Sequence, residues 1–510
     1  MLIFETVLAL LLGAIALSAF ASRLGVPYPT ILALGGAVVA FIPGAPQLDL
    51  PPDLILALFV APILLDAAHD TSLRDLRKNW VAVAGLALVA VVLTTVCVAF
   101  VAKRFFPALP WAAAIALGAL VAPPDAVAAL AVMRHVDPPH RIRKVLEGES
   151  LLNDASALLI YKLAVGAVAV GTFSLTGALP TFVLVFVGSI VVGWLVAWVP
   201  VYLSRFIEEA PTVVILQFVT TFGVWLLAER LGLSGVITIV VMGITLARRT
   251  SLHMSPRLRV VSFAIWETAT SVLNILAFTL IGLQIRPLVE ALEGRQRWYA
   301  LGAAAVIGAV VVAVRFVWAV AFDTALRLKD RLSRKPPTAT HTPSIKGAMV
   351  IGWSGMRGIV TLAAALALPA NFPRRDFILL TAFIVVFGTL VLQGLTLRPL
   401  LKLLRLPKDT VIETEIALAR KAALKAAIES LTNNQTPAAK QLRVEYEEAL
   451  THTRRGRDPH DSSHNALRRQ VLEISRRALD ELRTADTIGD DAYRLVQEEL
   501  DWLDLSAGST

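Results

Sequence analysis

The chain has 510 residues, of which 56% are hydrophobic and 17% are charged, and its mean hydropathy is +0.68. This apolar composition excludes an ordinary soluble enzyme and is typical of a protein with many membrane spans. The single cysteine, Cys97, excludes intramolecular disulfides and cysteine-based metal sites, and the net charge of +9 does not indicate nucleic acid because basic residues of membrane proteins mark topology.

Hydropathy predicts an all-α polytopic membrane protein with about thirteen transmembrane helices. The first apolar run lacks a basic leader and an obvious cleavage site, so we expect a first span rather than a signal peptide. The predicted spans are 2–21, 27–44, 53–71, 79–102, 109–133, 147–171, 177–203, 210–229, 232–248, 258–285, 298–326, 345–369 and 376–401. With the amino terminus outside, inner loops hold 19 Lys and Arg against 8 in outer loops. The positive-inside rule therefore predicts an outer amino terminus and a cytoplasmic carboxyl terminus.

The density of charge changes near Leu406. Residues 1–405 are about one-eighth charged, whereas residues 406–510 are about one-third charged. We expect a transmembrane domain over 1–405 and a cytoplasmic helical domain over 406–510, with amphipathic helices that include residues 417–431 and 490–505. A solvated bundle, a dimer contact and a regulatory role all stay open for this tail.

Ionisable side chains inside predicted spans are costly and mark functional sites by default. The short list of such candidates is Asp66, Asp125, Glu149, Asp154, Lys162, Glu267, Arg315, Asp323 and Arg357. No histidine lies near mid-membrane, so proton handling is expected to fall to carboxylates. Lys162 is expected to reach the interface or to pair with an acid such as Glu5, and the roles of Glu267 and Asp323 are left open.

Polar residues gather at the start of the sixth predicted span. Ser150 and Asp154 are four residues apart and share one helix face, and Glu149 and Asn153 share the adjoining stripe. One of these two stripes can offer oxygens to an ion, while the other stabilises the helix through contacts with its neighbours. The alternative is a helix that begins at the cytoplasmic surface, with Glu149 complementing the helix dipole.

The fifth predicted span is expected to be broken. Pro123 and Pro124 remove two backbone donors, and Asp125 follows at the discontinuity. A broken helix with an acid at the break is typical of ion-coupled transporters, although a simple proline kink is the alternative.

The twelfth predicted span has glycines at positions 352, 355 and 358 and contains Arg357. The fifth and twelfth spans run in opposite directions, so they fit two broken, crossing helices of inverted-topology repeats. Arg357 is permanently charged and needs an acid partner, for which Glu149 is the first candidate.

Five motifs, in this order, make the chain resemble the monovalent cation:proton antiporters of the NhaP type, which are related to the animal sodium/hydrogen exchangers. They are "APILLDA", "PPDAVAA", "GESLLNDASALLIYK", "AIWETATSVLNILAFTLIGLQI" and "WSGMRGIVTLAAALALP". The resemblance covers all predicted spans. It implies a homodimer in the lipid bilayer of a plasma (inner) membrane that serves pH homeostasis and sodium transport, with no cofactor and no nucleic acid partner.

The resemblance also implies roles for individual residues. Asp154 would bind the cation and the proton alternately, Asn153 would orient the site, and Glu149 would pair with Arg357. The expected cation and proton site is formed by Asp154, Asn153, Ser150, Asp125, Asp66 and Pro124, with Asp154, Ser150 and Asp125 as Na+ ligands. Pro124 stands where many relatives have threonine, so it offers a carbonyl in place of a hydroxyl.

The predicted activity is the exchange of a monovalent cation for a proton by alternating access, with Na+ the first candidate and Li+ or K+ as alternatives. Because Asn153 replaces the second acid of electrogenic relatives, the exchange is expected to be electroneutral, one proton per cation. A cation channel is the main alternative. The sequence "GWSG" at 352–355 also matches the nucleophile motif of intramembrane serine proteases, but no span supplies the histidine base that such an enzyme needs.

Overall fold

The computed structural model describes residues 2–24, 26–42, 51–133, 138–170, 175–207, 209–249, 255–286, 294–332, 344–407, 409–456, 458, 460, 462–485, 487 and 490–506. These residues form helices, turns and loops, and none of them lies in a strand. The chain divides into two compact units, Met1–Lys408 and Asp409–Thr510. The predicted boundary after residue 405 lies just before this division.

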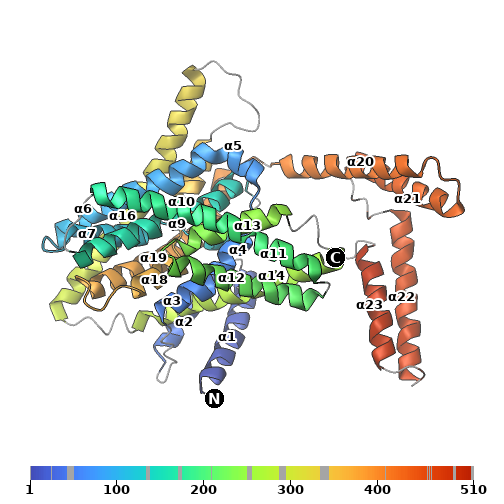
Figure 1. Cartoon of the computed structure of the whole chain (residues 1–510), viewed down its shortest axis with the longest axis horizontal. Coiled ribbons are helices and arrows are strands. Elements are labelled where there is room, and N and C mark those ends of the chain that lie inside the picture. Colours follow the sequence, from blue (N-terminus) through green and yellow to red (C-terminus); the bar gives the residue numbers. More distant parts are fainter. Residues whose placement is uncertain are drawn as a thin grey trace. The chain divides into compact units, whose positions relative to one another are not determined.

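The larger unit is a bundle of helices (Figure 1). In chain order they are α1 (Leu2–Leu24), α2 (Tyr28–Ala40), α3 (Pro52–Ile55), η1 (Leu56–Val60), α4 (Ala61–His69), α5 (Leu73–Ala84), η2 (Gly85–Ala90), α6 (Val91–Phe105), α7 (Trp111–Val121), α8 (Ala126–Met133), α9 (His140–Val170), α10 (Leu175–Val196), α11 (Trp198–Leu203), η3 (Ser204–Phe206), α12 (Ala210–Arg230), α13 (Gly235–Arg249), α14 (Pro256–Leu283), α16 (Gly294–Leu332), α17 (Ile345–Trp353), α18 (Ile359–Leu366) and α19 (Arg375–Leu404).

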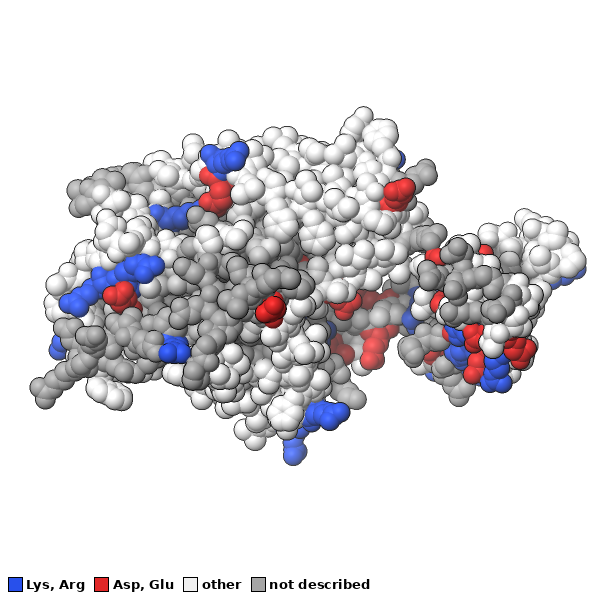
Figure 2. Space-filling view, turned by 90° about the horizontal axis from the view of Figure 1, so that it is seen from below, with Lys and Arg blue, Asp and Glu red and all other residues white. Residues whose placement is uncertain are grey.

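Eight helical segments of the described residues are long and apolar enough to cross a membrane, and three shorter apolar helices accompany them. The eight are Leu73–Phe105, Trp111–Met133, His140–Ala169, Pro180–Phe206, Ala210–Arg230, Leu258–Leu283, Trp298–Lys329 and Arg375–Leu404. Much of the visible described surface of this unit lacks charged residues, as Figure 2 shows. The all-α membrane architecture is therefore confirmed, whereas the count of thirteen spans stays a prediction.

The helices of the larger unit pack mainly within two groups. In the α2–α14 group, helices α1, α2, α4, α10, α12, α13 and α14 contact one another, and in the α7–α9 group the contacts join α5, α6, α7, α8, α9, α16, α17, α18 and α19. Glycines lie at close approaches between helices: Gly36 of α2 faces the backbone of Gly282 of α14, and Gly118 of α7 faces the backbone of Thr95 of α6. Small residues at such positions let membrane helices approach closely.

Both predicted helix breaks are confirmed. α7 ends at Val121 and α8 begins at Ala126, because the two prolines between them have no backbone N–H and cannot continue a helix. α17 ends at Trp353 and α18 begins at Ile359, across the glycine-rich segment. The two breaks meet directly, since the Asp125 amide donates to the Met356 carbonyl at 2.6 Å.

Two π-helical turns, η1 and η2, interrupt the third and fourth predicted spans and were not predicted. Such turns leave backbone groups without their usual helical partners and often lie at functional sites. In η2, the Ala87 carbonyl accepts the Ser156 hydroxyl of α9 at 2.6 Å. This bond ties the irregular turn to the helix that carries Asp154.

The smaller unit consists of α20 (Val411–Leu431), α21 (Pro437–Arg454), α22 (Ser463–Thr484) and α23 (Asp490–Ser506). α20 packs on α21, and α22 packs on α23. Acidic and basic side chains alternate over its visible surface (Figure 2). The two helices expected over residues 417–431 and 490–505 lie within α20 and α23.

Candidate functional site

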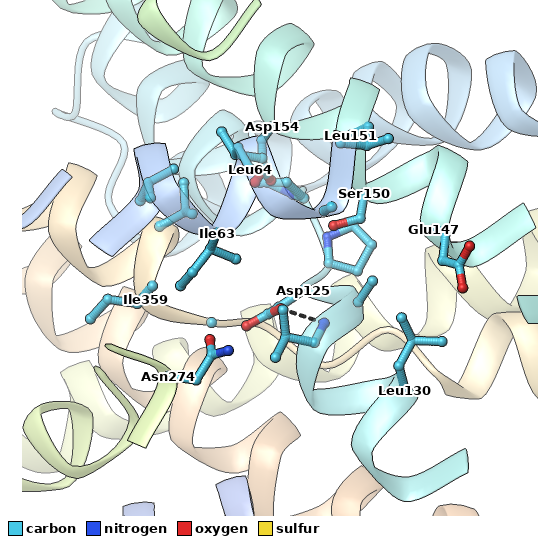
Figure 3. A pocket seen from close by; sticks show the side chains of 18 of the residues that line it. Ile63, Leu64, Asp125, Leu130, Glu147, Ser150, Leu151, Asp154, Asn274 and Ile359 are labelled. Atoms are coloured by element: carbon cyan, nitrogen blue, oxygen red, sulfur yellow. Dashed lines mark hydrogen bonds between the residues drawn. The ribbon is translucent and has the colours of Figure 1, made fainter. Parts of the chain in front are cut away.

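A cavity of about 320 Å³ lies between the two groups of helices (Figure 3). Its wall is formed by α4 and α14 of one group and by α8, α9, the α7–α8 break and the start of α18 of the other. The polar residues of the lining are Asp70, Asp125, Arg143, Glu147, Ser150, Asp154, Asn274 and Thr361. The cavity therefore brings together polar groups that are far apart in the sequence.

Asp154 lies in the wall of this cavity on α9, and its side chain is only 8% exposed. Within the described residues its carboxylate forms no hydrogen bond, so its oxygens have no protein donor to hold them. Ser150, one turn earlier, lines the same cavity and its hydroxyl likewise has no hydrogen bond to a described residue. The spacing of four residues thus places a carboxylate and a hydroxyl on the wall of one cavity.

Asp125 lies at the α7–α8 break and caps the following helix. Its Oδ1 accepts the Val127 amide at 2.8 Å (Figure 3), so the negative charge lies at the positive amino end of α8. Its other carboxylate oxygen lies against Gly358, where a Cβ atom would overlap the carboxylate. Close contact, rather than an unusual backbone conformation, therefore requires glycine at position 358.

Arg357 is fully buried at the crossing of the two broken helices. Its Nε donates to the Val121 carbonyl at 3.1 Å, its Nη2 to the Ala122 carbonyl at 3.3 Å, and its Nη1 to the Gly355 carbonyl. These carbonyls lie at the carboxyl ends of α7 and α17, where the helix dipoles are negative. The guanidinium thus satisfies backbone acceptors that the two breaks have freed.

The predicted ion pair between Glu149 and Arg357 is wrong. Glu149 pairs with Arg315 of α16 instead, through Nη1 to Oε1 and through Nη2 to Oε2 at 2.9 Å. The Glu149 and Arg315 side chains are only 1% and 3% exposed. The physical reason is that backbone carbonyls already occupy the Arg357 guanidinium, whereas Arg315 presents its planar fork to the carboxylate.

Asn153 is fully buried and lies outside the cavity lining. Its Nδ2 donates to the Pro124 carbonyl at 3.0 Å, and its Oδ1 accepts the Asp154 amide at 2.6 Å. The carboxamide therefore joins α9 to the α7–α8 break. Pro124, expected in the cation and proton site, lines the cavity, but its carbonyl already accepts this hydrogen bond.

Asp66 lies apart from the other predicted site residues. It lines a second cavity of about 90 Å³, together with His69, Gln217 and Trp266. Its neighbour Ala67 lines the larger cavity, so the two residues lie on different faces of α4. The structure therefore does not bring Asp66 together with Asp154, Asp125 and Ser150.

Sequence reasoning missed Asn274 of α14 and Thr361 of α18 as residues of the cavity. The signal for Asn274 was present, because a carboxamide interrupts the apolar stretch "SVLNILAF" within a motif that had been recognised. Thr361 carries no comparable signal, since threonine is common in membrane helices.

Other charged residues of the spans have local roles. Lys162 pairs with Glu229 at 2.7 Å, not with Glu5, and Asp323 pairs with Arg327 one turn along α16 at 2.8 Å. Glu267 is exposed.

The serine of the "GWSG" sequence has a structural position. Ser354 is 1% exposed and its hydroxyl donates to the Val350 carbonyl at 2.6 Å, at the end of α17. A nucleophilic serine needs a base that takes its proton. Here the hydroxyl proton is held by a backbone carbonyl, which argues against the protease alternative.

Comparison with known proteins gives matches over most of the chain. Residues 7–403 match the family described as sodium/hydrogen exchanger, transmembrane. The chain is 30% identical over 521 residues to an uncharacterized Na(+)/H(+) exchanger of Mycobacterium tuberculosis, covering 97% of this chain and 94% of the relative. It is 31% identical over 447 residues to the Na(+)/H(+) antiporter ApNhaP of Aphanothece halophytica, covering 86% and 82%. The solved structure of the sodium proton antiporter MjNhaP1 from Methanocaldococcus jannaschii at pH 8 matches with a TM-score of 0.59 and 19% identity, covering 79% of this chain and 98% of that chain.

Proposed function

We propose that this chain, which belongs to the sodium/hydrogen exchanger family, exchanges Na+ for protons by alternating access at Asp154. Membership of that family makes it an integral membrane transporter that exchanges cations for protons. Li+ and K+ are the alternative cations. A relative in Bacillus subtilis, 28% identical over 527 residues, is named a sodium, potassium, lithium and rubidium/H(+) antiporter.

The observation that carries the proposal is the position of the Asp154 carboxylate, in the wall of a cavity and without a hydrogen bond to a described residue. A deprotonated carboxylate there has lone pairs and a charge for a cation, and a protonated one has lost that charge. Ser150 and Asp125 add oxygens from the same cavity, and oxygen ligands suit hard cations. Competition between cation and proton for one carboxylate then couples the two fluxes.

An electroneutral exchange of one proton per cation follows if Asp154 is the one group that titrates. Asn153 has no charge to exchange and is held by its bonds to Pro124 and Asp154. Asp125 caps α8 through the Val127 amide, so we assign it a ligand role rather than the proton transfer.

With the orientation expected from the basic loops, the cavity opens toward the cytoplasmic side of a plasma (inner) membrane. Asp70, Arg143 and Glu147 line the cavity near helix ends that the positive-inside rule assigns to the cytoplasm. Glu147 precedes Asp154 by seven residues of α9, a distance of about 10 Å along the helix. This arrangement supports an inward-open conformation, from which movement between the two groups of helices would expose Asp154 to the other side. A homodimer stays an expectation.

Substitution of Asp154 by asparagine in proteoliposomes tests this proposal. Asp154→Asn should abolish Na+-driven proton flux, because a carboxamide cannot alternate between a charged form that holds the cation and a protonated form that releases it. Glu267→Gln is the matched control, since Glu267 is also an acid in a span but is exposed and outside the cavity lining.

Two results would contradict the proposal. Proton flux that persists in Asp154→Asn would refute the site, and a wild-type rate that depends on membrane potential would refute the one-to-one ratio. Single-channel currents in a planar bilayer would indicate a cation channel instead, because an electroneutral exchanger carries no current.

A further inference from the structure

α14 supplies one wall of the cavity but belongs to the α2–α14 group of helices, whereas Asp154 belongs to the α7–α9 group. It packs closely against α2, and Gly282 of α14 and Gly36 of α2 bring their backbones into contact. Three residues of α14 line the cavity, namely Asn274, Ala277 and Phe278. Asn274 is thus the one polar side chain that α14 presents to the space lined by Asp125 and Asp154.

The Asn274 carboxamide has no protein partner among the described residues, and its side chain is half-buried. In Figure 3 its amide end is turned into the cavity, toward the side where the Asp125 carboxylate lies. A partly buried carboxamide that makes no hydrogen bond costs free energy unless water or a ligand satisfies it. Its oxygen is an acceptor of the same kind as the serine and aspartate oxygens of the site.

We propose that Asn274 is a cation ligand of the cytoplasm-facing state alone. Its carboxamide oxygen replaces one water of the cation as the cation approaches Asp154, and this contact is lost when the cavity closes. This inference rests on the proposed exchange at Asp154.

The restriction to one state follows from the placement of the ligands. Asp154, Asp125 and Ser150 all belong to the α7–α9 group or to its helix break, so movement of that group carries them together. Asn274 belongs to the α2–α14 group, so the same movement changes its distance from all three. Asn274 should therefore affect cation binding from the cytoplasmic face and leave binding from the outer face unchanged.

Kinetics measured separately at the two membrane faces test the inference. Asn274→Leu removes the oxygen and keeps the branched shape of the side chain. The KM for Na+ should rise about tenfold in inside-out vesicles, with little change of maximal rate. In right-side-out vesicles the KM should stay unchanged. Asn274→Asp restores an oxygen and should keep the KM at or below that of the wild type. Thr268→Val is the control on the same helix, because Thr268 is exposed and its hydroxyl bonds only to Ala264 of its own helix.

Each outcome is decisive. An unchanged KM at both faces, or an equal rise at both faces, would overturn the inference, the second because it indicates a general distortion of the site. If Asn274→Leu does not fold, as judged by size-exclusion chromatography, Asn274→Ala replaces it. Asp154→Asn separates this inference from the proposed function. Proton flux that persists in Asp154→Asn refutes the function. An inactive Asp154→Asn together with an unchanged KM in Asn274→Leu refutes the inference alone.

Discussion

Removing one charge of the buried pair between Glu149 and Arg315 should strongly destabilise the larger unit. The two side chains are 1% and 3% exposed, so either one left alone is a charge away from water without a counter-charge. Breaking such a pair typically lowers the free energy of unfolding by about 3–5 kcal/mol. Removing both charges, in Glu149→Gln with Arg315→Gln, should cost less than the sum of the two single changes, with a coupling of about 2–3 kcal/mol.

The assay is denaturant unfolding of the purified full chain in mixed micelles, followed by the fluorescence of its 10 tryptophans. A second double-mutant cycle, which combines Glu149→Gln with Arg357→Gln, separates the two candidate partners of Glu149. Because the Arg357 guanidinium donates to backbone carbonyls, its coupling to Glu149 should be smaller than that of Arg315. Additive effects for Glu149 and Arg315, or a larger coupling with Arg357, would refute the assigned pairing.

Two further predictions concern the helix break and the tail. Gly358→Ala should abolish exchange and lower the free energy of unfolding by about 1–3 kcal/mol, because its Cβ would overlap the Asp125 carboxylate. Gly388→Ala is the control, since the added Cβ meets open space and the variant should behave as the wild type. Normal exchange by Gly358→Ala would contradict this account, because it would show that the helix break relaxes. In the tail, the amide of Ser463, the first residue of α22, donates to Glu448 and holds the pKa of this carboxyl below its usual value of 4.5. Since the folded pKa is depressed, the stabilisation is present above about pH 4.5 and is lost as the pH falls through the folded pKa. Hydrogen exchange at the start of α22 should thus be slower in the wild type than in Glu448→Gln above that pH, with the difference vanishing in acid; a difference independent of pH would contradict this assignment.

Helical periodicity and proline chemistry predicted the parts of the site that depend on local sequence. The spacing of four residues predicted that Ser150 and Asp154 share a helix face, and both line one cavity. Pro123 and Pro124 predicted the break because neither has an N–H to donate. These features need no knowledge of neighbouring helices.

Contacts between distant helices could not be predicted in this way. Glu149 and Arg315 are 166 residues apart, and the rotation of α16 decides which arginine reaches the carboxylate. α4 presents Ala67 to the larger cavity and Asp66 to the smaller one, so its rotation about its own axis decides which residue joins the site. The charged residues could be found from the sequence, but their partners depend on how the helices pack and rotate.

The release of protons on cation binding tests the exchange at Asp154 most directly. Purified protein in weakly buffered detergent solution is titrated with Na+ on the acidic side of its working range while the pH is recorded. If cation and proton compete for one carboxylate, each Na+ bound should release about one proton, and Asp154→Asn should release none. Cation binding without proton release in the wild type, or unchanged release in Asp154→Asn, would contradict the account.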